Sequence, residues 1–223
     1  MKILTFSFEG QRNLGCVTKE GRILNPSLAW QRYDHCLAGT NPPREVLDVI
    51  RDGEQALQAV REISERAADD VHAPLTEDEK VDYLARIPAP MKNVFCVGRN
   101  YRAHIIEGNI ARGRDPHSFP EALEFFTKPP TTVTRHRGDV LRHAHLTNML
   151  DYEVELAIVI GKAGRDIKED DALSHVFGYT IVNDITARDL QARHGQWFKG
   201  KALDTSCPIG PVIALAASVP QPN

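Results

Sequence analysis

Long hydrophobic runs are absent from this chain of 223 residues. No apolar stretch approaches the roughly 20 residues that a membrane-spanning helix requires, so we expect no membrane partner. The first ten residues, MKILTFSFEG, turn polar too early for the hydrophobic part of a secretory signal. Their alternation of apolar and polar residues indicates a first β-strand instead.

Cysteine is scarce, and the four cysteines that occur are far apart. Cys16, Cys36, Cys96 and Cys207 form no CxxC pair, which argues against a zinc knuckle and against a disulfide framework. Reduced, structural thiols are typical of proteins in a reducing compartment. We therefore expect a cytoplasmic protein.

An excess of one charge is also missing. The chain has 27 Lys and Arg against 30 Asp and Glu, a formal net charge of −3, so charge gives no reason to expect nucleic acid or an anionic membrane as partner. The basic stretch RHRGDVLRHAH is too short for nucleic acid and lacks interleaved aromatic residues. Its histidines, His136, His143 and His145, could form a transition-metal patch, but such histidines are usually surface or interface residues.

The chain does contain enough apolar material for a core, with 42% hydrophobic and 26% charged residues. Strand-like patterns at residues 2–8 and 13–18, followed by helical periodicity over 43–70, indicate a small α/β unit. A proline-containing connector follows it. We expect one domain over residues 1–85 and a second, strand-rich domain over residues 90–223.

The second part reads mainly as strands joined by loops. Residues 102–122 are polar and rich in Arg, Gly and Pro, which favours a lid or binding loop over a regular element. A short helix is expected over 170–176 and a helical turn within 185–193. Strands are expected at residues 124–127, 139–142, 152–160, 178–184 and 211–216. The pattern predicts an α+β fold that is mostly β.

Three carboxylates lie inside or beside apolar, strand-like runs: Glu153 and Glu155 in DYEVELAIVIGK, and Asp184 in GYTIVNDITARD. Ionised acids are costly in such places unless a counter-charge compensates for them. A spacing of two residues on a strand puts Glu153 and Glu155 on one face. Val154 and Leu156 then face the other way, and we expect them to lie in a core.

A divalent cation is one way to compensate for these acids. Three oxygen donors suit Mg²⁺, Mn²⁺ or Ca²⁺ better than zinc, because no His or Cys is close in the sequence. The alternative is that ExE forms the solvent face of an edge strand, and for this pattern alone the alternative is favoured. With Asp184 at the end of a second apolar run, both interpretations stay open.

Five stretches occur in order between Val94 and Pro211: VGRNYRAHIIE, FFTKPPTTV, DYEVELAIVIGK, GYTIVNDITARDLQ and KGKALDTSCPIGP. In their order and spacing they resemble the fumarylacetoacetate hydrolase family. The resemblance implies a catalytic domain built as a mixed β-sheet roll, preceded by a small N-terminal α/β domain. It also implies a homodimer.

The resemblance further implies the roles of individual residues. Glu153, Glu155 and Asp184 would bind one divalent metal, Mg²⁺ first among the candidates, and the substrate would be a 2-oxo or β-diketo acid. His104 and Glu107 would form an acid–base dyad on one side of a helical turn. Lys201 would offer positive charge to a developing enolate. Substrate contacts are implied for Tyr101, Lys128, Arg188 and Gln191.

Hydrolysis of a C–C bond in an acylpyruvate or fumarylacetoacetate-type acid is the leading expectation. Glu107 would orient His104, which would take a proton from water. Hydratase, isomerase and oxaloacetate decarboxylase activities are alternatives, because the motifs do not separate them. A catalytically inactive binding or scaffold protein is a second alternative. Breakdown of aromatic compounds or sugar acids is the expected setting.

Several of these residues have a plainer interpretation. His104 taken alone is more often a surface histidine, and Lys201 could be solvated. Arg188 could pair structurally with Asp189 or Asp184. The functional interpretation of each residue therefore depends on its setting among the family's motifs.

The end of the sequence departs from the family pattern. Family members continue past the CPIGP strand with further strands and a Thr-Gly-Thr-Pro loop that closes the pocket, whereas this chain ends at SVPQPN. We therefore expect either a truncated form or a protein whose remaining strands come from elsewhere. Residues 211–217 are expected to leave an open strand edge, which favours aggregation or a partner.

Overall fold

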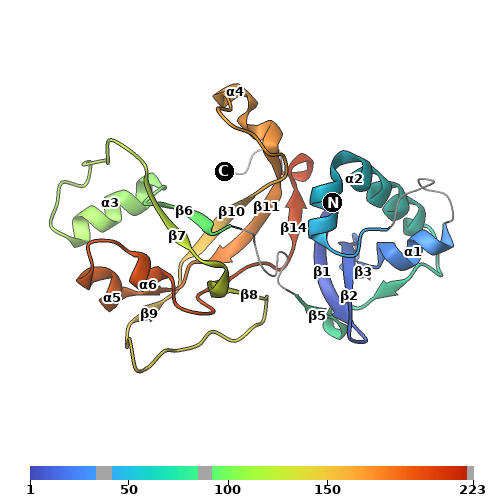
Figure 1. The fold of residues 1–223 in the computed structure, drawn as a ribbon, viewed down its shortest axis with the longest axis horizontal. Helices are drawn as coiled ribbons and strands as arrows, with labels where there is room; N and C mark the ends of the chain where they lie inside the picture. Colours follow the sequence, from blue (N-terminus) through green and yellow to red (C-terminus); the bar gives the residue numbers. More distant parts are fainter. Residues whose placement is uncertain (34–41, 85–91, 220–223) are drawn as a thin grey trace.

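The structure is a computed structural model that describes residues 1–33, 42–84 and 92–219. An eight-stranded sheet extends from the strand-rich part into the N-terminal part (Figure 1). Its strands follow the order β10 (Val154–Ile160), β11 (Val176–Asn183), β14 (Ile213–Leu215), β1 (Lys2–Phe8), β2 (Gln11–Val17), β3 (Ile23–Leu24) and β4 (Leu75–Thr76), with β5 (Asp82–Tyr83) also paired to β1. The expected α+β, mostly β fold is confirmed.

Two helices cover the N-terminal strands. The helix expected at 43–70 is α2 (Val46–Ala68), which bends where Gly53 adopts φ 68°; a second helix, α1 (Pro26–Arg32), was not expected. The N-cap side chain of Asn25 accepts a hydrogen bond from the Leu28 amide, 3.2 Å long, which fixes the start of α1. No helix in the described ranges is long and apolar enough to cross a membrane.

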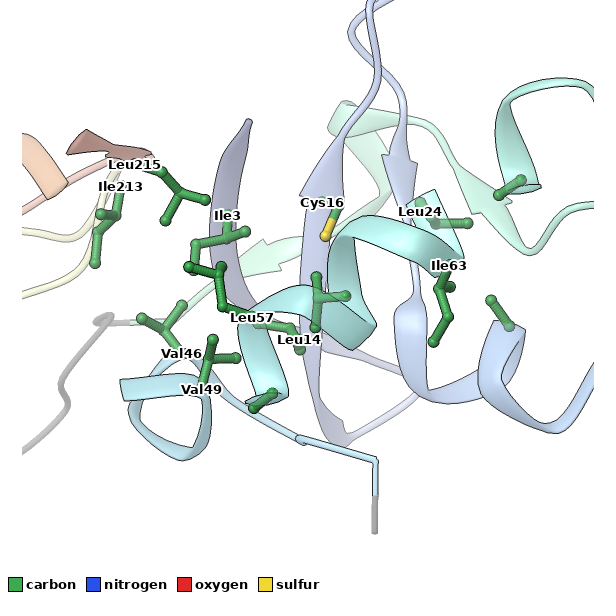
Figure 2. Close-up of a cluster of buried hydrophobic side chains, with 14 residues drawn as sticks. Ile3, Leu14, Cys16, Leu24, Val46, Val49, Leu57, Ile63, Ile213 and Leu215 are labelled. Carbon is green, nitrogen blue, oxygen red and sulfur yellow. The ribbon is translucent and has the colours of Figure 1, made fainter. Parts of the chain in front are cut away.

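Strand β14 ties the strand-rich part to the N-terminal part. It pairs with β11 on one side and with β1 on the other, where Ile3 lies opposite Ile213. Ile213 and Leu215 are buried in the same apolar cluster as Ile3 and Val46 (Figure 2). The expectation of an open edge at 211–217 is therefore wrong, because both sides of β14 are occupied.

The expected division into residues 1–85 and 90–223 stays a prediction. Its boundary lies within residues 85–91, outside the described residues. The sheet and the apolar cluster nevertheless both include residues from each side of that boundary.

The remaining strands and α-helices lie outside the large sheet. They are β6 (Val94–Gly98), α3 (Arg102–Ala111), β7 (Glu124–Lys128), β8 (Val133–Thr134), β9 (Leu150–Asp151), α4 (Glu169–Ala172), β12 (Thr186–Ala187), α5 (Arg188–Arg193), α6 (Phe198–Lys201) and β13 (Cys207–Pro208). Strands β6 and β7 form an antiparallel pair, and Figure 1 shows α3 beside it. The strand expected at 139–142 is wrong, because these residues form no strand.

We expected the segment 102–122 to be a loop. Its first ten residues instead form α3. Ile105 and Asn109, four residues apart, are the buried positions of this helix. The Asn109 side-chain amide donates to the Ser118 carbonyl at 2.9 Å, which folds the rest of the segment back along the helix. A composition rich in Arg, Gly and Pro concealed this short helix.

Strand β10 forms the edge of the large sheet, and its two faces differ. Glu153, just before the strand, and Glu155 lie on a half-buried face. Val154 and Leu156 lie on the opposite face, as expected, but they are 69% and 39% exposed and not in a core. The alternative interpretation placed ExE on the solvent face of an edge strand. It is right that β10 is an edge strand. The two glutamates, however, lie on the more buried of its two faces.

Candidate active site

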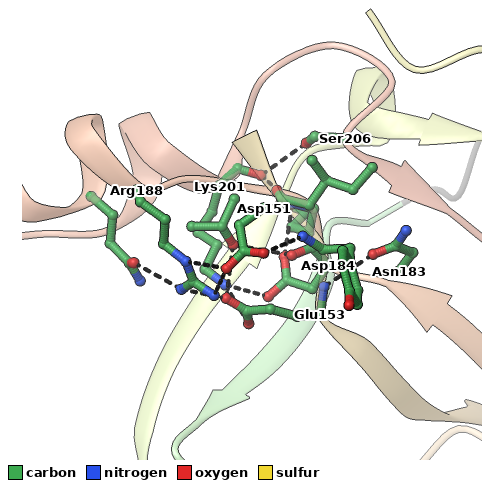
Figure 3. Close-up of polar contacts among 12 residues, drawn as sticks. Asp151, Glu153, Asn183, Asp184, Arg188, Lys201 and Ser206 are labelled. Carbon is green, nitrogen blue, oxygen red and sulfur yellow. Dashed lines mark hydrogen bonds and ion pairs between the residues drawn. The ribbon is translucent and has the colours of Figure 1, made fainter. Parts of the chain in front are cut away.

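Two of the three acids, Glu153 and Asp184, lie where β10 begins and β11 ends, and Glu155 follows within β10. Val154 lies opposite Asn183 in the antiparallel register, so Glu153 and Asp184 extend from the same end of the strand pair. The Asp184 amide donates to the Glu153 carbonyl at 2.8 Å, and the Glu153 amide donates to the Asn183 side chain at 3.1 Å. Figure 3 shows these residues converging with two cationic side chains. The backbone therefore fixes the two acids relative to each other.

Lys201 joins two of the acids. Its Nζ lies 2.9 Å from Glu153 Oε2 and 2.6 Å from Asp184 Oδ2, and the side chain is only 2% exposed. The same ammonium lies 4.8 Å from the centre of the Phe126 ring, within range of a cation–π contact. The structure brings Lys201 to the acids, and the interpretation of this residue as solvated is wrong.

Arg188 caps the acid cluster from the solvent side. Its Nη1 lies 2.6 Å from Glu153 Oε1 and donates to Gln191 Oε1 at 3.2 Å. Its Nε and Nη2 bind Asp151 Oδ2 at 2.9 and 2.8 Å. The alternative pairing with Asp189 or Asp184 is wrong, because Asp151 and Glu153 are the partners of Arg188.

Asp151 is a site residue that sequence reasoning missed. It precedes Glu153 by two residues, so the alternation that groups Glu153 with Glu155 extends back to it. Through this position Asp151 holds the guanidinium of Arg188 (Figure 3). The DxExE pattern was the signal that could have found this residue.

The two glutamates differ in their electrostatic surroundings. Burial alone would raise the pKa of Glu153, but the nearby Lys201 and Arg188 lower it below its usual value. The pKa of Glu155 is raised, first by burial and then by the charges of Asp184 and Glu153, against smaller opposing effects of Lys201 and His104. Glu155 is therefore the acid whose charge is least compensated.

These residues fit a divalent cation in two respects. Asp184 Oδ1 is buried and has no hydrogen-bond donor among the described residues, although Lys128 Nζ lies 2.9 Å away as an ion pair outside hydrogen-bond geometry. Glu155 forms no ion pair with any described residue. Carboxylate oxygens without donors suit Mg²⁺ or a similar hard cation.

The acids are not gathered around one point in the described part of the chain. No three His, Cys, Asp or Glu side chains there lie close enough together to hold a metal ion. The ammonium of Lys201 stands between Glu153 and Asp184 instead. Binding of a cation by all three acids would therefore require side-chain rearrangement around Lys201.

The expected dyad lies on α3, on the outer side of the site. His104 and Glu107 are both exposed, as is Tyr101 at the N-cap. Among the described residues no ion pair or hydrogen bond joins His104 to Glu107. His104 is nevertheless close enough to Glu155 for its charge to lower the pKa of that carboxyl. Of the α3 residues named by the sequence, His104 is the one that the structure relates to the acids.

In the histidine-rich stretch, His143 and His145 form no hydrogen bond or ion pair with the three acids among the described residues. His143 Nε2 is 3.0 Å from the Asp204 carbonyl, and the His143 and His145 ring centres are 6.3 Å apart. The contact with Asp204 fastens this stretch to the segment that follows α6. A structural role therefore accounts for His143 without a metal.

Trp197 positions the helix that carries Lys201. Its ring packs edge-on against Phe126, with ring centres 5.7 Å apart, and lies directly against Gly98. A Cβ added at Gly98 would overlap the Trp197 ring. Absence of a side chain at Gly98 therefore lets α6 approach the β6–β7 pair closely.

Replacing Gly98 by alanine is expected to displace Trp197 and to lower the free energy of unfolding by about 1–3 kcal/mol, as overpacking of a core does. Urea unfolding and the near-ultraviolet circular dichroism of tryptophan measure the two effects. Gly195→Ala is the matched control, because no atom lies within 4 Å of a Cβ at Gly195. Equal unfolding curves and spectra for both variants would contradict this packing role.

Comparison with known proteins relates the whole chain to one family of enzymes. Residues 93–223 match the family described as fumarylacetoacetate (FAA) hydrolase C-terminal. The oxaloacetate tautomerase YisK of Bacillus subtilis (strain 168) is 46% identical over 227 residues, which cover 100% of this chain and 72% of the relative. The mitochondrial oxaloacetate tautomerase FAHD2A of Bos taurus is 35% identical, and the match covers 81% of this chain and 54% of the bovine protein.

Two solved structures resemble the fold over nearly the full chain. The fumarylacetoacetate hydrolase of Exiguobacterium antarcticum has a TM-score of 0.71 at 34% identity, covering 97% of this chain and 67% of that protein. The maleylpyruvate hydrolase of Sphingobium sp. SYK-6, solved with manganese(II) and pyruvate, has a TM-score of 0.66 at 26% identity, covering 100% and 70%. The chain thus spans between about half and three quarters of the length of these four proteins.

Proposed function

This chain belongs to the fumarylacetoacetate hydrolase family, and we propose that it is a divalent-metal-dependent enzyme that interconverts the keto and enol forms of oxaloacetate or a similar 2-oxo acid. The observation that carries the proposal is the charge pattern of the site. Three buried or half-buried cations (Lys128, Lys201 and Arg188) face four carboxylates (Asp151, Glu153, Glu155 and Asp184). One negative charge, that of Glu155, is left over. Such a site can accept a divalent cation together with an acidic substrate.

Glu153, Glu155 and Asp184 would hold the cation, and Mg²⁺ or Mn²⁺ suits their oxygen atoms. When bound, the cation supplies a Lewis acid for the 2-oxo group. Manganese accompanies pyruvate in the similar maleylpyruvate hydrolase, which supports this assignment. Magnesium as the native ion remains a proposal.

Arg188 and Gln191 orient the acid in this proposal. The hydrogen bond between them and the contacts with Asp151 fix the guanidinium plane, so its charge meets a substrate carboxylate in a set direction. Tyr101, exposed at the N-terminus of α3, can contact the outer end of the substrate. Positioning of this kind keeps the 2-oxo group beside the acids.

Lys201 and His104 take part in the proton transfer. A ring nitrogen of His104 removes a proton from C3 of the keto acid, the C–H electron pair forms the C2–C3 double bond, and the carbonyl electrons move to O2. The Lys201 ammonium stabilises the negative charge on O2. Transfer of a proton from water to O2 completes the enol, the His104 imidazolium returns its proton to water, and the reverse sequence regenerates the keto form. This reaction requires one base and no attacking water.

Hydrolysis of a C–C bond is the second candidate. Glu107 stands three residues after His104 on α3, so a closer arrangement of the segment would let it orient His104 toward a water molecule. The similarity to a maleylpyruvate hydrolase favours this candidate. Tautomerisation ranks first because the relative that is 46% identical over this whole chain is an oxaloacetate tautomerase.

The proposal is tested by following enol-oxaloacetate absorbance with Mg²⁺, with Mn²⁺ and with EDTA. We expect metal-dependent acceleration above the uncatalysed rate, and a loss of about 10²–10⁴-fold in rate for His104→Gln. His143→Gln is the matched control, because that histidine contacts the Asp204 carbonyl and forms no hydrogen bond or ion pair with the acids in the described part of the chain.

Absence of acceleration with either metal would overturn the tautomerase proposal. Metal-dependent loss of acylpyruvate absorbance in its place would support the hydrolase candidate. If neither reaction occurs, and Glu153→Ala binds Mn²⁺ as well as the wild type does, the chain is an inactive binding protein.

A further inference from the structure

Lys128 is the most deeply buried cation of the site. It ends β7, and its side chain is 0% exposed. The family resemblance placed it among the substrate contacts. In the structure its ammonium is surrounded by atoms of the protein itself.

Three groups from two other segments bind this ammonium. It donates hydrogen bonds to the carbonyl of Lys201 and, at 3.2 Å, to the carbonyl of Ile185. The carboxylate oxygen Oδ1 of Asp184 lies 2.9 Å from Nζ. The two carbonyl groups accept hydrogen bonds from the ammonium, and the Asp184 carboxylate compensates for its charge as an ion pair.

The groups that Lys128 binds belong to the elements that form the site. Ile185 directly follows Asp184 in the turn after β11, and Lys201 ends α6. Ser206 Oγ donates to the same Lys201 carbonyl at 3.1 Å, so this carbonyl is held from two sides. Lys128 thus joins β7 to the acid-bearing turn and to the end of the helix whose side chain bridges the acids.

We propose that Lys128 is a positioning residue, whose ammonium fixes the Asp184 carboxylate and the Lys201 backbone, and that it does not contact the substrate. The inference rests on the proposed function, because it assigns Asp184 to the metal and Lys201 to the enolate oxygen. A buried ammonium is stable only when it is paired and hydrogen-bonded, and Lys128 meets both conditions. A substrate carboxylate would have to displace these partners to reach it.

The first test measures access to the amine. Native protein is treated with an amine-acetylating reagent, and the modification of each lysine is followed by mass spectrometry. We expect Lys128 to stay unmodified under conditions that modify Lys199, which is exposed on the same helix as Lys201. Modification of Lys128 at the rate of Lys199 would overturn the proposal.

The second test compares Lys128→Met with Lys199→Met as the matched control. Loss of a group that orients a metal ligand typically weakens metal binding about 10–100-fold, and we expect this loss of Mn²⁺ affinity, measured by electron paramagnetic resonance without substrate, for Lys128→Met alone. We also expect kcat to fall with little change in KM. A substrate-binding lysine would give the opposite result, with unchanged Mn²⁺ affinity and a raised KM.

Lys128→Arg and the acetylation experiment keep the inference testable if Lys128→Met does not fold. The arginine variant retains the charge and is expected to recover part of the Mn²⁺ affinity; a KM defect at wild-type Mn²⁺ affinity would overturn the inference. Failure of the wild type to bind Mn²⁺ would overturn the proposed function instead. The acetylation pattern would then still decide whether Lys128 is held inside the protein.

Discussion

Replacing Asp184 by asparagine is expected to lower the free energy of unfolding by about 3–5 kcal/mol in metal-free protein. The carboxylate is the shared counter-charge of Lys128 and Lys201, which are 0% and 2% exposed. Asparagine keeps the shape but leaves two buried ammonium groups with less compensation. Urea unfolding in EDTA measures the change, and Mn²⁺ titration of the same variant should show loss of binding.

Asp204→Asn is the control for this prediction. Asp204 is exposed and lies three residues after Lys201, so the same chemical change is made next to the site without removing a buried charge. We expect its unfolding curve to match the wild type. An Asp184→Asn protein as stable as the control would mean that other groups compensate for the two lysines.

Replacing Glu155 by glutamine is expected to have the opposite effect on stability and a similar effect on metal binding. Glu155 has no cationic partner among the described residues, and burial with the charges of Asp184 and Glu153 raises its pKa. Neutralising it removes repulsion, so metal-free Glu155→Gln should be at least as stable as the wild type at neutral pH. Its Mn²⁺ affinity should fall by more than about 100-fold, since a ligand itself is lost and not merely its support.

The stability difference between this variant and the wild type should depend on pH. A raised pKa means that the folded protein binds the Glu155 proton more tightly than the unfolded chain, whose value is near 4.5. The stabilising contribution of that proton is complete below pH 4.5 and is lost as pH rises through the folded-state pKa. In EDTA, Glu155→Gln should therefore match the wild type below pH 4.5 and exceed it at higher pH.

Glu121 is an exposed acid in the segment after α3, and Glu121→Gln serves as the control. Urea unfolding of the wild type and of both variants across this pH range measures the stability differences. A wild-type protein that stays equal to Glu155→Gln at neutral pH would show that the Glu155 charge is compensated. Equal Mn²⁺ affinity of Glu155→Gln and the wild type would remove Glu155 from the proposed metal site.

The family, the fold class and the relation between the acids were predictable from the sequence. The family follows from the order of the motifs along the sequence. The placement of Glu153 and Glu155 on one face follows from the two-residue alternation of a β-strand. Strands β1, β2 and β11 and helix α2 also follow local patterns and were found near their expected positions. Membership of an enzyme family is confirmed by the comparisons.

Other features depend on the tertiary structure and left little trace in the sequence. Lys128 follows FFT in a strand, and nothing local tells whether its ammonium meets solvent, substrate or carbonyl groups. Val154 and Leu156 alternate as core residues do, but alternation does not say whether another layer covers the face. Roles of His104 and Glu107, a homodimer, a cytoplasmic location and aromatic catabolism all stay predictions.

The insertion of β14 between β11 and β1 has a consequence for recombination among relatives. Lys2 and Ile3 lie opposite Ala214 and Ile213 in the antiparallel ladder, although more than 200 residues of chain lie between them. A chimera that takes its beginning from one parent and its end from another must therefore reconcile two halves of a single ladder. Inheritance of the first strand is tied to that of β14, whatever crossover point is chosen between them.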